Sequence, residues 1–182
     1  MDNKVEGNVL VCIDDDGVCR IKLVGNIRYD SSSKGFMDFV NAEIPNEKVK
    51  DVIVDMRECS YIDSTDIGIL AQIALIQSEK RQKKPTIIYS DTSQEESSVI
   101  QAVSDVNVNS LFDLYIGKDI NESGYNKLGN FDCSQYEVSK IMYATHKLLS
   151  DLDESNKKRF ESVVKYLGES ATFSAAASDK KR

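Results

Sequence analysis

The sequence predicts an α/β fold, in which a mixed β-sheet has helices packed against it and a helical pair follows. Two observations predict it. Near the N-terminus, two β-branched apolar runs flank an Asp-Gly turn, and after them short apolar runs alternate with longer runs of helical period. With 182 residues, 41% of them apolar, the chain is long enough to bury one sizeable core.

The first two elements form an antiparallel hairpin. Residues Asn8 to Ile13 and Val18 to Val24 are the apolar runs, and Asp14-Asp15-Asp16-Gly17 joins them. A short loop that ends in Asp-Gly favours a tight turn between paired strands. The acidic loop lacks the ligand spacing and the closing glutamate of an EF-hand, so we interpret it as a turn.

A first helix follows the hairpin. The serines at 31–33 can each cap a helix that carries Phe36, Phe39 and Val40 on one face. Pro45 lies where this helix is expected to end, because proline cannot continue a helix.

Residues Asp51 to Met56 are a short apolar run that suits the middle of a sheet. The helix predicted after it spans Ser64 to Gln82. Its apolar residues occupy two neighbouring stripes, which together cover more than half of its circumference. This helix is therefore expected to be largely buried.

The remaining elements of the domain continue the alternation. Residues Thr86 to Tyr89 predict a strand, Gln94 to Ser104 a helix and Leu111 to Ile116 a last strand. Strands that alternate with helices form parallel crossovers, so the sheet should be mixed, with the hairpin as its antiparallel edge.

The C-terminal third has a different character. Two runs of helical period follow a polar, glycine-containing segment, and they resemble an αα-hairpin with one apolar face. We favour packing of this face back on the domain; a homodimer contact and the docking of a second partner are the alternatives. The predicted organisation is a domain at 1–120, a linker at 121–133, a helical extension at 134–168 and a disordered tail at 169–182.

Composition narrows the class of partner. The net charge of -7 and the pI near 4.8 argue against nucleic acid as the principal partner. We expect no membrane association, because no apolar stretch is long enough to span a bilayer, and no apolar leader is evident, so a cytoplasmic protein is expected. The four cysteines show no metal-ligand spacing, and the lone His146 is expected to be a solvated or packed helix residue. No cofactor is predicted.

The most informative segment is Ile62-Asp63-Ser64-Thr65-Asp66-Ile67-Gly68-Ile69-Leu70, which follows a predicted strand and opens the long helix. It resembles the signature of STAS domains, as do the turn at Gly25-Asn26-Ile27 and the closing strand at Leu111-Phe112-Asp113-Leu114-Tyr115. The resemblance covers about residues 8 to 120 and is nearest to the bacterial anti-sigma factor antagonists, also called anti-anti-sigma factors.

The resemblance implies a partner-switching function. The unphosphorylated protein would bind a serine-kinase anti-sigma factor and free the sigma factor, the kinase would phosphorylate Ser64, and a serine phosphatase would restore it. Ser64 matches the phosphoacceptor, Asp63 the acidic residue before it, and Thr65 the following hydroxyl, a second candidate acceptor. Asp66 departs from the family pattern, which commonly has glycine there.

The residues themselves support this interpretation. A serine between a strand and a helix should lie at the surface, and a helix N-terminus tolerates a phosphate. Near Asp63 and Asp66, the added charge would oppose partner binding, so phosphorylation would be an off switch. The predicted partner surface is Asp63, Ser64, Thr65, Asp66 and Ile67. The alternative is that Ser64 is only the N-cap of its helix.

Other functions remain as alternatives. The chain lacks a G-x-S-x-G elbow and a glycine-rich phosphate loop, and Ser64 has no evident base, so we do not expect an enzyme. A STAS scaffold or sensory module is one alternative. A phosphorylation-switched regulator of another effector, such as a signalling enzyme, is the other.

Overall fold

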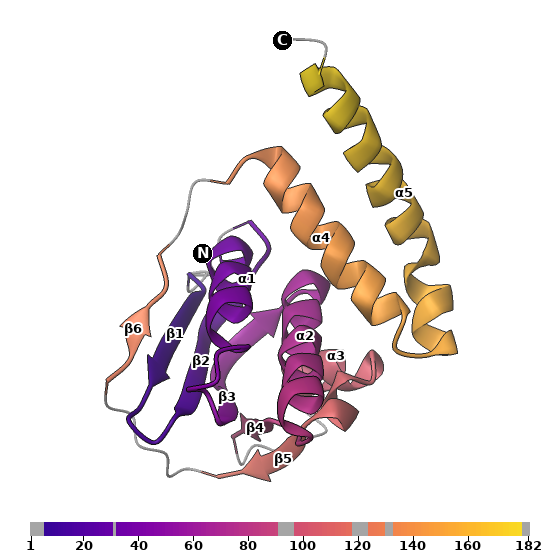
Figure 1. Cartoon of the computed structure of the whole chain (residues 1–182). Helices are drawn as coiled ribbons and strands as arrows, with labels where there is room; N and C mark the ends of the chain where they lie inside the picture. The colour runs from indigo at the N-terminus through magenta and orange to yellow at the C-terminus, as the bar shows by residue number, and fades with distance from the viewer. Residues whose placement is uncertain (1–5, 31, 91–96, 118–123, 130–132, 180–182) are drawn as a thin grey trace, which may run out of the picture.

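The computed structural model describes residues 6–30, 32–90, 97–117, 124–129 and 133–179, and it confirms the α/β fold (Figure 1). Its sheet has the strand order β5-β4-β3-β2-β1-β6. β1 pairs antiparallel with β2 and β6, and the other neighbours are parallel. The strands are β1 (Asn8–Ile13), β2 (Val18–Ile27), β3 (Asp51–Ile62), β4 (Thr86–Tyr89), β5 (Asp113–Ile116) and β6 (Asn126–Lys127).

The helices occur in the predicted order, with small shifts of their ends. The helix predicted from Gln94 begins at Ser98, and residues 91–96 lie outside the described part of the chain. Residues Val108–Leu111 form a 3-10 turn, so the last strand of the domain starts at Asp113. The α-helices are α1 (Ser33–Glu43), α2 (Ser64–Arg81), α3 (Ser98–Asp105), α4 (Gln135–Ser150) and α5 (Glu154–Asp179).

The turn of the hairpin is built as its composition predicts. The Asp14 carboxylate accepts hydrogen bonds from the backbone N–H of Asp16, at 3.1 Å, and of Val18, at 2.8 Å. Arg20 donates to the other carboxylate oxygen at 2.6 Å. Gly17 has a φ of +85°, a conformation that glycine adopts without strain. The acidic loop is thus a turn whose Asp14 carboxylate is hydrogen-bonded within the hairpin itself.

Strand β3 is longer than predicted, and this extension positions the site. The sequence indicated a strand that ends at Met56 followed by a loop, but β3 continues to Ile62. The reason is that β2 also continues, so that Asn26 pairs with Tyr61 and Ile27 with Ile62, after two irregularities in the register. Only one residue, Asp63, separates the end of β3 from α2.

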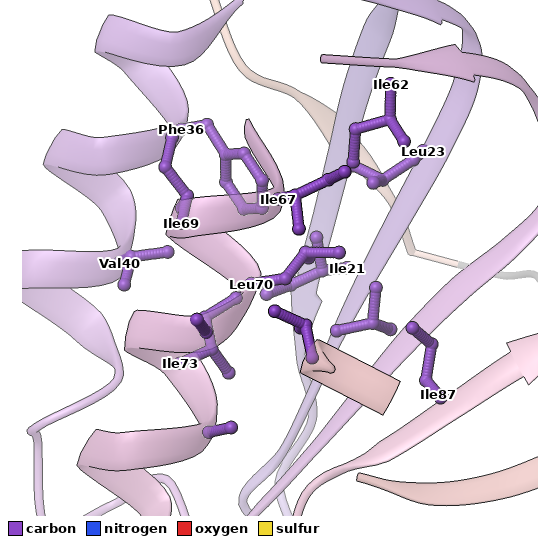
Figure 2. Close-up of a cluster of buried hydrophobic side chains, with 14 of the residues drawn as sticks. Ile21, Leu23, Phe36, Val40, Ile62, Ile67, Ile69, Leu70, Ile73 and Ile87 are labelled. Carbon is purple, nitrogen blue, oxygen red and sulfur yellow. The ribbon is translucent and has the colours of Figure 1, made fainter. Parts of the chain in front are cut away.

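The core lies between the sheet and helices α1 and α2, and Figure 2 shows its central side chains. Helix α2 is buried on most of its circumference, as its apolar stripes predict. Figure 2 shows Ile69 of α2 close to Phe36 and Val40 of α1, and all three are fully buried. Because α1 and the sheet both pack against α2, the start of α2 is held firmly in place.

Helices α4 and α5, called here the C-terminal pair, pack back on the domain. They lie against α2 rather than against the sheet, with α5 outside α4 (Figure 1). Leu149 of α4 and Phe160 of α5 belong to the same buried cluster as the domain core. The Asn156 side chain donates to the Val106 carbonyl oxygen at 2.8 Å, a buried hydrogen bond between α5 and the domain.

Two segments differ from the predicted organisation. The predicted linker contains β6, whose Asn126 and Lys127 pair with β1. The predicted disordered tail is helical as far as Asp179, and residues 180–182 lie outside the described part. Alanine at 171 and at 175–177, with no proline or glycine after Gly168, favours continuation of the helix.

Candidate functional site at the start of helix α2

Asp63 is the residue that caps α2. Its backbone is extended, and its carboxylate accepts hydrogen bonds from the backbone N–H of Thr65 at 3.0 Å and of Asp66 at 3.1 Å. It also accepts from the Tyr29 backbone N–H at 2.8 Å, which ties the end of β2 to the start of α2. The alternative that Ser64 is the N-cap is therefore wrong. A carboxylate at this position also suits the positive end of the helix dipole.

Ser64 is the first residue of α2, and its hydroxyl contacts α4. Ser64 Oγ lies 2.9 Å from His146 Nε2, and His146 Nδ1 lies 2.7 Å from the Met142 carbonyl oxygen. A carbonyl oxygen can only accept, so the proton of the neutral ring is assigned to Nδ1 and Nε2 accepts from Ser64. Ser64 was expected to lie at the surface without an evident base. Instead it is partly buried and donates to an imidazole.

His146 closes the site from the α4 side. Its side chain is buried, and its ring meets the Phe160 ring edge-on with centroids 5.5 Å apart. The sequence signal for this role was faint: a histidine on the apolar face of a predicted helix, 82 positions from its partner. The group that orients the ring is a main-chain carbonyl rather than a carboxylate, so the Ser64–His146 pair lacks the acid of a catalytic triad.

Helices α2 and α4 are in close contact one turn further along α2. Gly68 faces Thr145 of α4, and a Cβ added at Gly68 would lie 2.5 Å from Thr145 Cβ and 2.9 Å from its carbonyl oxygen. Any larger residue at 68 would therefore push α4 away. Thr145 has no exposed surface, and its hydroxyl donates to the Ile141 carbonyl oxygen in its own helix. The contact with Gly68 is therefore van der Waals packing.

The five residues of the predicted partner surface are not equally available. Thr65, Asp66 and Ile67 are buried, with exposed fractions of 2%, 0% and 3%. Asp63 and Ser64 are partly exposed. The partly exposed portion of the motif is thus its first two residues, and of these Ser64 points its hydroxyl at His146.

Asp66 forms its side-chain hydrogen bonds inside the domain. Both of its carboxylate oxygens lie 2.9 Å from Ser33 Oγ, the hydroxyl of the first residue of α1. Burial raises the pKa of Asp66 well above its ordinary value, the Asp63 charge raises it further, and the Ser33 hydrogen bond opposes the shift. This carboxyl thus links α1 to α2 and favours its protonated form.

An exposed cluster lies beside the cap and was not predicted from the sequence. Tyr29 donates its backbone N–H to Asp63, and its side chain is 44% exposed. Tyr61, two residues before Asp63, is 42% exposed, and the Arg28 guanidinium lies 4.7 Å from the centre of its ring. Arg28, Tyr29 and Tyr61 are called here the aromatic patch. Arg28 and Tyr29 directly follow β2 and Tyr61 belongs to β3, so the pairing of these two strands brings them together.

Within the described ranges, no three histidine, cysteine, aspartate or glutamate side chains gather in a way that could hold a metal ion. All four cysteines are free thiols. None of the helices in the described part of the chain is both long and apolar enough to cross a bilayer. A scan against protein-family models and a search of curated proteins each found no match to this chain.

Proposed function

We propose that this chain is a STAS-type regulator whose binding to a partner is switched off by phosphorylation of Ser64, without catalysis of its own. The partner proposed from the sequence resemblance is a serine-kinase anti-sigma factor, with a serine phosphatase acting in reverse, in the cytoplasm. The observation that carries the proposal is that Asp63 caps α2, so the Ser64 hydroxyl at its first position is not needed for capping.

The start of α2 can accept a phosphate without loss of the fold. Helix N-termini have a positive dipole end, which favours an anion. The hydrogen bonds that start the helix come from Asp63 and do not involve the Ser64 side chain. The effect of modification should therefore fall on whatever approaches Ser64 rather than on α2 itself.

Phosphorylation would make the surface around Ser64 more negative. A phosphate adds about -1.5 to -2 charge next to the Asp63 carboxylate. A partner that accepts a neutral hydroxyl would have to desolvate this much larger negative charge, and that is unfavourable unless the partner supplies cations. Phosphorylation is therefore proposed as an off switch.

The aromatic patch supports a protein partner. Tyrosine and arginine are the residue types enriched at the energetically dominant positions of protein interfaces. Tyr29 and Tyr61 are both exposed, and the backbone of Tyr29 is fixed by Asp63. The patch thus offers a partner an exposed aromatic contact beside Asp63, the residue that precedes Ser64.

The test is capture of partners from host lysate by Ser64→Ala and Ser64→Asp forms side by side. We expect the alanine form to retain an ATP-binding serine kinase, and the aspartate form to retain about tenfold less, the equivalent of about 1.4 kcal/mol. Ser60→Asp is the matched control, because Ser60 is an exposed serine near the end of β3. It should bind like the unmodified chain.

Other outcomes separate the alternatives. Retention of a different effector by the alanine form only would keep the switch and replace the anti-sigma partner. Equal retention of the same proteins by both forms would contradict the switch and favour a scaffold or sensory module.

A further inference from the structure

Helix α4 covers the residue that the proposed partner and kinase must reach. The His146 imidazole occupies the space directly over Ser64 Oγ, at 2.9 Å. Thr145, the preceding residue, fills the space over Gly68. Both contacts come from consecutive residues of one helix, so they form and break together.

The hydrogen bond points Ser64 Oγ at the His146 ring, so the hydroxyl oxygen is covered although the residue as a whole is partly exposed. A phosphoryl group would replace the proton that Nε2 accepts and would put phosphorus and three oxygens where the ring lies. A partner side chain that contacts the hydroxyl would meet the same obstacle. Modification and binding therefore both require α4 to move away from α2.

The residues that form the cover lie in the more deeply buried half of α4. The fully buried residues of α4 are all in its second half, from Thr145 to Ser150. The first half is capped by its own Ser134–Glu137 box, and Glu137 lies 3.8 Å from Lys34 of α1. A salt bridge between partly exposed side chains contributes little. The first half is therefore the more weakly held part, and uncovering Ser64 requires the buried half, which carries Thr145 and His146, to shift on α2.

The contact at Gly68 determines how closely α4 can approach. With no side chain at 68, the Thr145 main chain comes near enough for His146 to reach Ser64. An element of a partner that takes the place of α4 can likewise approach closely at Gly68, and it must present a hydrogen-bond acceptor opposite Ser64.

We infer that α4 is an autoinhibitory cover, which occupies in cis the surface around Ser64 and competes there with the kinase and the partner. This inference rests on the function proposed above, since it assigns regulation to the same residue. Phosphate on Ser64 and the covered state exclude each other. By linkage, whatever releases α4 promotes modification, and modification holds α4 open.

The cover can be tested without any partner. In the full-length chain, Ser64→Cys places a thiol under α4, and its alkylation by iodoacetamide is followed by mass spectrometry of the peptide that contains residue 64. Fragment ions assign the label to residue 64, because the native Cys59 lies in the same tryptic peptide. At about pH 9 most thiols are ionised, so access rather than activation by His146 sets the rate. The same chain unfolded in urea gives the unprotected rate.

We expect the folded reporter to react about 100-fold more slowly than the unfolded one, because reaction waits for local opening. Adding Gly68→Ala should raise the rate about tenfold, since the new Cβ pushes against Thr145. Gly168→Ala is the matched control. Its Cβ would meet only the edge of the Tyr143 ring, at 3.3 Å, within the C-terminal pair, so the rate should stay unchanged.

Thr145→Leu enlarges the α4 side of the same contact and leaves the sequence of α2 unchanged. If Gly68→Ala does not fold, the labelling rate of Thr145→Leu tests the cover instead. Full reactivity of the folded reporter, or no acceleration by either substitution, would overturn the cover. Thr145→Leu should also increase partner capture. If the labelling behaves as expected and no variant captures a partner, the cover stands and the proposed function fails.

Discussion

Replacing Asp63 with alanine is expected to lower the free energy of unfolding by about 2 to 3 kcal/mol. One carboxylate accepts three main-chain hydrogen bonds, from Thr65, Asp66 and Tyr29. Alanine leaves all three N–H groups without this acceptor, at the junction of β2, β3 and α2. Urea unfolding followed by circular dichroism measures the loss.

Two controls make the result specific to the cap. Asp63→Asn keeps an oxygen that can accept the bonds to Thr65 and Asp66, so it should recover roughly half of the loss. Asp30→Ala removes the same charge from an exposed residue nearby and should change stability by less than about 0.5 kcal/mol. A loss at Asp63 no larger than at Asp30 would mean that the cap does not hold the junction together.

Replacing Asp66 with asparagine is expected to change how stability depends on pH. Folding raises the pKa of Asp66, chiefly because the carboxyl is buried and also because Asp63 is near. Above the ordinary carboxyl pKa the unfolded chain has lost this proton while the folded chain keeps it. The folded state then binds more protons, so stability falls as pH rises, by up to about 1.4 kcal/mol per pH unit, until the raised pKa is reached.

Asparagine has the shape of the protonated carboxyl and still accepts from Ser33, but it does not titrate. Asp66→Asn should therefore match the wild type near the ordinary carboxyl pKa and exceed it progressively at higher pH. Urea midpoints over a pH series measure the difference. Asp15→Asn, in the exposed hairpin turn, removes one charge without this burial and should run parallel to the wild type. Parallel curves for Asp66→Asn as well would contradict a raised pKa.

Much of the domain could be predicted because its signals are local. The Asp14 to Gly17 loop carries its own turn chemistry, and the apolar circumference of α2 required burial wherever it packed. The alternation of strands and helices then left a mixed sheet as the simple topology. These features depend on residues close together in the chain.

The features that were missed depend on long-range pairing. The extension of β3 to Ile62 follows from the continuation of β2 beside it, and no residue between Met56 and Ile62 signals it. The cap was assigned to Ser64 as an alternative, but a strand that ends at Ile62 leaves Asp63 as the connecting residue. A serine next to an aspartate does not show which of the two side chains turns inward.

The relation between Ser64 and α4 could not have been predicted in the same way. Periodicity showed that α4 had an apolar face, but not that this face would lie on α2 or that His146 would meet Ser64. Asp66 is the converse case. The sequence marked it only as a difference from the motif that the segment resembles, and its role became clear when Ser33 of α1 was found opposite it.

The central claim is that phosphate on Ser64 and partner binding exclude each other, and one measurement tests it directly. The chain is recovered from its own cells, the free and partner-bound pools are separated by size-exclusion chromatography, and the phosphate occupancy of Ser64 is measured in each by mass spectrometry. The account predicts phosphoserine at 64 in the free pool and an unmodified Ser64 in the bound pool. Equal occupancy in the two pools would contradict it.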